Sequence, residues 1–169
     1  MQAPVLNPTT DALFNVAIAW IFMFLPLLLL DQRGRHLPKV ALWGAAMFLT
    51  NVFLTPYMAL RARNPVEPVI TSPKKGVLAR IFGVVGFAVG TGAIAWGLFA
   101  RPEFGGWTTR WSYFLGELTT SRVAIAFCVD LVLFAIWQMI LMGAIEPIGS
   151  PKRWLRFIPL WGLAIWLIL

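Results

Sequence analysis

The stretch DALFNVAIAWIFMFLPLLLL, residues 11–30, carries no charged side chain after Asp11. The hydrocarbon core of a bilayer is ~30 Å thick, and a helix needs ~20 mostly apolar residues to cross it. Pro8 and Thr10 lie just ahead of the stretch and are typical of a helix start. The stretch therefore predicts a transmembrane helix over residues 11–30.

Four more apolar stretches follow, separated by polar connections. They predict helices over residues 38–60, 77–99, 122–144 and 154–169. The last has only 16 residues, or ~24 Å of helix, so it spans only where the bilayer is thinned or its basic end snorkels. We expect a single all-α domain over residues 1–169, a polytopic transmembrane bundle of about five spanning helices.

The composition supports a bilayer environment. Hydrophobic residues make up 59% of the chain and charged residues 12%, which is about half the share usual in soluble domains. A net charge of +7 is compatible with nucleic acid as a partner. However, the basic residues flank the apolar stretches and form no continuous stripe. We therefore expect the lipid bilayer, and not nucleic acid, to be the partner of these charges.

The basic residues do not fix the orientation of five spanning helices. One side would collect 6 of them and the other side 8. The first group is Arg33, Arg35, Lys39, Arg101, Arg110 and Arg122; the second is Arg61, Arg63, Lys74, Lys75, Arg80, Lys152, Arg153 and Arg156. Because this difference is small, the positive-inside rule leaves the orientation open. The N-terminus has no basic segment, so a cleaved signal or transit peptide is not expected.

The connection at 101–121 contains aromatic and leucine side chains at helical spacing. Trp107, Trp111, Phe114 and Leu118 recur at intervals of four, three and four, with Arg110 elsewhere on the helical wheel. This pattern predicts an amphipathic helix over residues 107–118 that lies in the membrane interface. The alternative is an aromatic loop within the interfacial tryptophan girdle.

Small residues form a straight seam along the helix predicted at 77–99. They recur at spacings of four, three, four, three and four, and are Ala79, Gly83, Gly86, Gly90, Ala93 and Gly97. Such a seam lets a second helix approach closely in lipid. Two interpretations stay open: packing against another helix of this chain, or contact with another membrane subunit or a flat lipophilic molecule.

Asp130 is the candidate for chemistry inside the membrane. It lies about eight residues into the fourth predicted helix, where an unpaired charge costs ~2.5–3.5 kcal/mol or more. Asn51 and Thr91 are expected near its depth, Gln138 is a second polar group, and Arg122 lies two turns away. Asp130 is therefore a structural group satisfied by its neighbours, a proton, ion or substrate site, or a contact with a partner subunit.

The usual catalytic and metal-binding sets are missing from the sequence. His36 is the only histidine and Cys128 the only cysteine, so no haem or zinc ligand set is present and we expect no metal site. The GxSxG, HExxH and P-loop motifs are also absent. The sequence identifies no cofactor, and it favours a protein that is not an enzyme.

Three segments resemble an uncharacterised family of small multi-spanning membrane proteins from cyanobacteria and chloroplasts. They are LTPYMALR at 54–61, SRVAIAFCVDLVLF at 121–134 and RFIPLWGLAIWL at 156–167. The resemblance brings no catalytic residue, cofactor or activity with it. It implies a photosynthetic lineage and a location in the bacterial plasma membrane or the thylakoid membrane.

Two functions are compatible with these features. The first is a non-enzymatic accessory or assembly protein that packs through the seam against a larger membrane complex, which the resemblance implies is a photosynthetic one. The second is a small membrane enzyme or carrier for an isoprenoid, quinone or pigment, with Asp130 as the polar group of its pocket.

Overall fold

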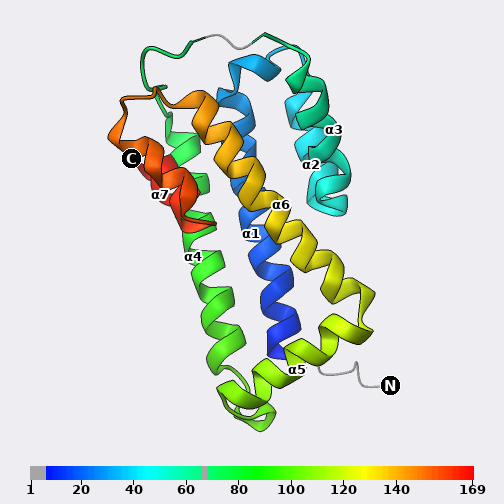
Figure 1. Cartoon of the computed structure of the whole chain (residues 1–169). Helices are drawn as coiled ribbons and strands as arrows, with labels where there is room; N and C mark the ends of the chain where they lie inside the picture. Colours follow the sequence, from blue (N-terminus) through cyan, green and yellow to red (C-terminus); the bar gives the residue numbers. More distant parts are fainter. Residues whose placement is uncertain (1–6, 66–67) are drawn as a thin grey trace.

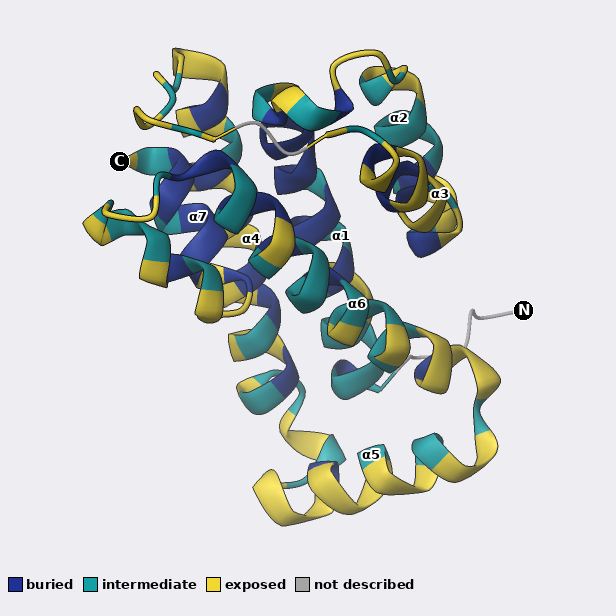
Figure 2. Ribbon diagram, turned by 45° about the horizontal axis from the view of Figure 1, so that its top comes forward, coloured by how far each residue is buried: buried dark blue, intermediate teal, exposed yellow. Residues whose placement is uncertain are grey.

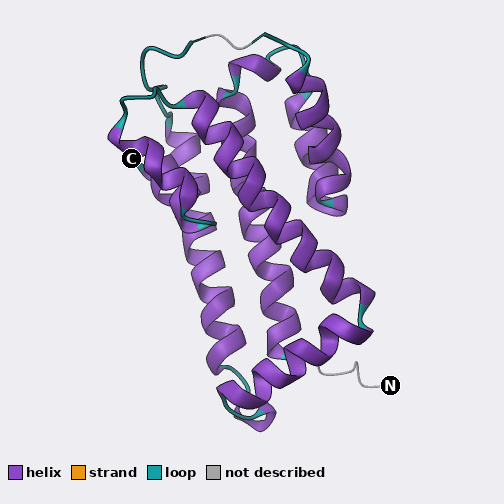
Figure 3. Cartoon of the chain, in the orientation of Figure 1, coloured by secondary structure: helices purple, strands orange, loops and turns teal. Residues whose placement is uncertain are grey.

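A computed structural model of the chain describes residues 7–65 and 68–169. These residues form helices joined by loops and turns, and no strand occurs among them (Figure 3). The all-α class is therefore confirmed.

Among the described residues, three helices are long and apolar enough to cross a membrane: α1 (Pro8–Leu30), α4 (Val77–Phe99) and α6 (Arg122–Ile145). They match three of the five predicted helices. The first begins three residues earlier than predicted because the Asn7 side chain accepts a hydrogen bond from the backbone N–H of Thr9 at 2.9 Å and caps the helix there.

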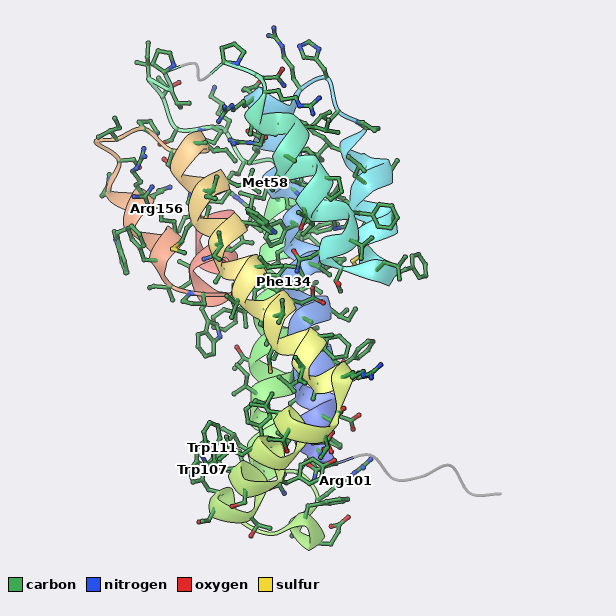
Figure 4. The ribbon with its side chains drawn as sticks, turned by 45° about the vertical axis from the view of Figure 1, so that its right-hand side comes forward. Met58, Arg101, Trp107, Trp111, Phe134 and Arg156 are labelled. Carbon is green, nitrogen blue, oxygen red and sulfur yellow. The ribbon has the colours of Figure 1, made fainter. Side chains whose placement is uncertain are left out.

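The two ends of the bundle differ. We call one the basic end; it contains the carboxyl ends of α1 and α6 and the amino end of α4 (Figure 1). At the opposite end, α5 (Trp107–Thr120) connects α4 to α6 after the short 3₁₀ helix η2 (Pro102–Phe104). A helix over 107–118 is thus confirmed. In Figure 4, Trp107 and Trp111 lie at this end, far from Met58 and Arg156.

The helical wheel separates Arg110 from the aromatic and leucine side chains of α5, and the structure shows that Arg110 is buried. It is 4% exposed, and its guanidinium donates to the carbonyl oxygens of Gly97 at 2.8 Å, of Arg101 at 3.0 Å and of Ala100. The Gly97 carbonyl lies in the last turn of α4, where no further helical N–H follows, and Ala100 and Arg101 come directly after the helix. Arg110 therefore closes the carboxyl end of α4.

The single helix predicted over 38–60 is wrong. After the 3₁₀ helix η1 (Gln32–Gly34), the chain forms α2 (Lys39–Leu49) and α3 (Asn51–Ala62), which lie side by side and run in opposite directions (Figure 1). The reversal occurs at Thr50, whose φ is 43°. This left-handed conformation is unfavourable for a β-branched residue, so outside contacts must hold the turn. We call α2 and α3 the first hairpin.

The predicted helix over 154–169 is also broken. It consists of the 3₁₀ helix η3 (Pro151–Phe157) and the short helix α7 (Trp161–Ile168), which turns back along η3. Pro159 has no N–H to donate and disfavours helix at the preceding residue, and Leu160 adopts a φ of 60°. We call η3 and α7 the second hairpin.

The seam of α4 packs inside the chain. All six of its residues are buried: Ala79, Gly83, Gly86, Gly90, Ala93 and Gly97. A Cβ added to Gly83 would lie 2.8 Å from the Ala164 carbonyl oxygen of α7, and one added to Gly86 would lie 2.3 Å from the Met23 side chain of α1. Packing within the chain therefore accounts for the seam, and a partner subunit cannot reach it.

The buried interior runs along α1, α4 and α7, whereas the outer faces of α2 and α5 are exposed (Figure 2).

Candidate functional site

Asp130 holds the turn of the first hairpin. Its Oδ2 accepts a hydrogen bond from the Thr50 hydroxyl at 2.6 Å, and its Oδ1 accepts one from Nδ2 of Asn51 at 2.7 Å. The Asn51 Oδ1 in turn accepts from the indole N–H of Trp137 at 2.9 Å. The predicted contact between Asp130 and Asn51 is therefore present, and it stabilises the strained turn at Thr50.

Gln138 holds the second hairpin through hydrogen bonds of its own side chain. This side chain is fully buried in α6. Its Nε2 donates to the carbonyl oxygen of Ile158 at 2.7 Å, next to the turn, and its Oε1 accepts from the indole N–H of Trp20 at 2.9 Å. Gln138 thus fixes the second hairpin to α1 and α6, and it does not join the Asp130 cluster.

Thr91, which was expected near the depth of Asp130, contacts another helix, and Arg122 lies two turns from Asp130 as expected. Thr91 accepts a hydrogen bond from the indole N–H of Trp161 at 3.0 Å and so contacts α7. Arg122 is exposed at the start of α6, at the end of the bundle that carries α5. The polar groups that meet Asp130 are therefore those of the first hairpin.

A buried charged cluster at the basic end was not predicted. Asp31 directly follows α1, and its Oδ2 accepts from the Tyr57 hydroxyl at 2.6 Å and from Nε of Arg61 at 2.6 Å. All three residues are at most 2% exposed. Gly34 makes room for them, since a Cβ there would lie 2.1 Å from the Tyr57 hydroxyl oxygen. The sequence signal was a carboxylate at the end of one apolar stretch and an arginine at the end of the next.

The base of the second hairpin has its own carboxylate. Glu146 directly follows α6 and accepts from the Ser72 hydroxyl and the Trp166 indole N–H, each at 2.6 Å. Burial raises the pKa of this carboxyl, but these hydrogen bonds and nearby Lys75 outweigh it, so the pKa is below its ordinary value. Glu146 therefore ties α7 and the chain before α4 to the end of α6.

Lys75 packs on the same cluster. Its ammonium lies 4.1 Å from the centroid of the Trp166 ring and donates to the Trp166 carbonyl oxygen. Burial, together with the positive charge of Lys152, lowers the pKa of Lys75 to about 8. The ammonium is thus held at the base of α7 by a cation–π contact and a hydrogen bond.

The described residues also form two hollows. A cavity of about 420 Å³ lies at the basic end beside Asp31 and Arg61. An apolar groove of about 210 Å³ lies between α1, α4 and α5 at the opposite end, with Trp107, Trp111 and Phe114 in its wall. Asp130 lines neither. Among the described residues, no group of His, Cys, Asp or Glu side chains could hold a metal ion.

No family model, curated protein or solved structure matches this chain. The functional argument therefore rests on the chain's own contacts. Of the four candidate residues from the sequence, Asp130, Asn51 and Gln138 have their side-chain polar atoms engaged in holding hairpins, and Arg122 is remote from them.

Proposed function

We propose that the chain is an integral membrane protein in which α1, α4 and α6 cross the bilayer and both hairpins enter only part way. At 1.5 Å per residue, α2 reaches ~16 Å and α7 ~12 Å, well short of a ~30 Å hydrocarbon core. Irregular backbone at membrane depth is tolerated where it is buried in protein. At the second turn Leu160 is buried and Gln138 bonds the carbonyl of Ile158, whereas at the first turn Asp130 bonds the side chains of Thr50 and Asn51.

This topology changes how many basic residues lie on each side of the membrane. Because neither hairpin crosses, basic residues from both sides of each hairpin fall in the half of the bundle that includes the basic end. Of the 14 basic residues, this half has Arg33, Arg35, Lys39, Arg61, Arg63, Lys74, Lys75, Arg80, Lys152, Arg153 and Arg156. Only Arg101, Arg110 and Arg122 lie toward α5. By the positive-inside rule, the basic end is the cytoplasmic or stromal side.

The function that these contacts support best is a non-enzymatic accessory or assembly protein of a larger membrane complex. The observation that carries the proposal is that Asp130, Asn51 and Gln138 are committed to holding the hairpins. A general acid or base needs a proton-transfer group within reach of a substrate, whereas both carboxylate oxygens of the half-buried Asp130 already accept hydrogen bonds from Thr50 and Asn51. The resemblance to cyanobacterial and chloroplast proteins favours a plasma or thylakoid membrane.

A partner must dock away from the seam, because the seam is covered. The opposite face of α4 is exposed and again has small residues at spacings of four and three, namely Ala88, Gly92 and Ala95. A Cβ on Gly92 would meet nothing within 4 Å in this chain. Small residues on a lipid-facing surface permit close approach of another helix, so this face is where we expect the partner.

The test is co-purification from the native host in mild detergent, with mass spectrometry of bound proteins. Gly92→Leu should lose the partner subunits while the protein remains folded and membrane-inserted. Val132→Leu on the exposed face of α6 is the matched control and should keep them. If wild-type protein brings down no stoichiometric subunit, the accessory role is wrong. If Gly92→Leu keeps its partners, the face of α4 is wrong.

A second candidate function is carriage of a lipophilic molecule such as an isoprenoid, quinone or pigment. The apolar groove beside α5 favours this function. The lipophilic molecule would bind in the groove and not at Asp130. Extraction of the purified protein should then yield a stoichiometric lipophile that Phe114→Arg eliminates. A preparation with no bound molecule except bulk lipid would rule this function out.

A further inference from the structure

The cavity at the basic end is enclosed by four parts of the chain. These are the end of α1 with η1, the end of α3, the connection before α4, and the end of α6. Its volume of about 420 Å³ lies within the range of small-molecule sites. Part of its wall is apolar, including Leu30, Val69 and Ile145. The cavity therefore suits a small molecule that combines a polar group with an apolar part.

The polar part of the wall is strongly cationic. Three guanidinium groups line it, those of Arg33, Arg35 and Arg61, together with the His36 imidazole. Asp31 is the only carboxylate among the described lining residues, and it already accepts from Tyr57 and Arg61. Among the described lining residues, positive charges therefore exceed negative charges by about two.

Arg61 is the most deeply buried of these groups. It is 2% exposed, and its Nε is paired with Asp31 at 2.6 Å. Its Nη2 is buried and has no hydrogen-bond partner among the described residues. A buried charged donor without a partner is costly. An anionic acceptor in the cavity would satisfy it with small adjustments of the side chain.

Arg33 and Arg35 have different surroundings. Arg33 donates to the carbonyl oxygens of Asn64 and Ala62, each at 2.7 Å, and so is held at the end of α3. Arg35 is exposed, and its Nε donates to His36 at 3.1 Å. Arg35 is therefore free to turn toward a ligand, whereas Arg33 contributes mainly its charge.

We propose that this cavity binds a phosphate monoester, with Arg61 as the buried anchor and Arg35 closing over the ligand from the open side. A phosphate monoester has a charge of about −1.5 to −2 at pH 7, which matches the excess positive charge of the wall. Guanidinium groups bind phosphate oxygens through paired, charge-assisted hydrogen bonds. The cavity lies at the ends of the proposed spans, so the phosphate belongs either to a lipid head group or to a soluble ester.

The experiment measures binding to the full chain in nanodiscs. Glycerol 3-phosphate is the soluble probe, and nanodiscs with phosphatidic acid, against phosphatidylcholine alone, supply the lipid probe. Saturable binding of glycerol 3-phosphate would support the site and identify a soluble ligand. Stabilisation by phosphatidic acid only would support the site and identify a lipid head group. A folded protein that responds to neither probe would overturn the proposal.

Two variants separate the site from general attraction to a basic surface. Arg35→Ala removes a lining guanidinium and should weaken phosphate binding about tenfold, the effect of one charge-assisted hydrogen bond. Arg63→Ala removes the same charge from an exposed position nearby that does not line the cavity, and it should change binding less than twofold. Equal losses in the two variants would show diffuse attraction and overturn the proposal.

Arg61→Lys tests the buried anchor. It keeps the charge but not the planar set of donors, so it should weaken binding at least tenfold. Because Arg61 also pairs with Asp31, the melting temperature of this variant is measured alongside. If the variant does not fold, the comparison of Arg35→Ala with Arg63→Ala decides the outcome.

Discussion

A polar side chain of α6 holds each of the two hairpins, but the hairpins differ in what else fixes the turn. Both enter from the basic end, both reverse at a non-glycine residue with positive φ, and both are tied at the base by a carboxylate that follows a long helix. The turn of the first hairpin is held by hydrogen bonds to Asp130. The turn of the second places Leu160, 3% exposed, against Gly90 of the seam.

The hairpins also differ in how deeply they are packed. In α2 only Ala46 is buried, whereas most of α7 is buried against α4 and η3. Polar contacts at a few points can therefore hold a half-length helix at the periphery of a bundle. A half-length helix inside the bundle depends instead on close packing against small residues. The four predictions below test this difference, beginning with the largest expected effect.

Gly83→Leu should loosen the second hairpin most severely. Its Cβ would lie 2.8 Å from the backbone carbonyl oxygen of Ala164, which cannot move aside as a flexible side chain can. Overpacking of this kind destabilises by about 3 kcal/mol. Thermal unfolding and amide exchange in α7 measure the effect. Gly92→Leu on the open face of α4 is the control, and an equal loss there would show that a larger side chain anywhere on α4, and not its contact with α7, is responsible.

Asp130→Ala should release the first hairpin and leave the second in place. It removes the acceptor for both Thr50 and Asn51, and hydrogen bonds to a charged group contribute about 1.5–3 kcal/mol. Faster amide exchange should appear in α2 and α3 and not in α7. Val132→Ala, on an exposed part of α6, should change neither. Uniformly faster exchange in both hairpins would contradict separate anchoring.

Gln138→Leu should loosen the second hairpin less than Gly83→Leu does. It removes the hydrogen bonds to Ile158 and Trp20, but seam packing on α4 remains. Side-chain hydrogen bonds in membrane proteins contribute about 0.6–1.7 kcal/mol. Amide exchange in α7 should rise modestly. A loss as large as that of Gly83→Leu would show that the second hairpin, too, depends on polar anchoring.

Acidification should give the smallest effect, confined to the base of the second hairpin. Because the pKa of Glu146 in the folded protein lies below 4.5, its contribution to stability is complete above pH 4.5 and is lost as the pH falls through the folded value. Exchange in α7 should increase over that window. Glu146→Gln should remove the dependence, and a dependence that persists in this variant would assign it to another group.

Much of the fold follows from sequence rules. The three long helices and α5 are predicted within a few residues, because their apolar runs and helical spacings need no information from other parts of the chain. The contact between Asp130 and Asn51 is also predicted, since an ionisable group at membrane depth needs a polar partner. The breaks at Thr50 and Leu160 are not, because each depends on side chains supplied by other helices.

The charged cluster at the basic end shows a second limit of sequence reasoning. Asp31 and Arg61 each stand at the end of an apolar stretch, where charged residues ordinarily face lipid head groups. Only the hairpin brings them together, because a fully spanning second helix would place Arg61 at the opposite side of the membrane. Residues 154–169 also signalled a departure from a simple span, because the stretch is short for a bilayer and Pro159 interrupts it.

The closure of α4 by Arg110 has a mechanical consequence. The Arg110 side chain of α5 bonds the carbonyl of Gly97 in the last turn of α4 and those of Ala100 and Arg101 just after it, so side-chain hydrogen bonds as well as the main chain join the two helices at this end. We expect a force on the exposed tryptophans of α5 to reach the carboxyl end of α4 through these bonds.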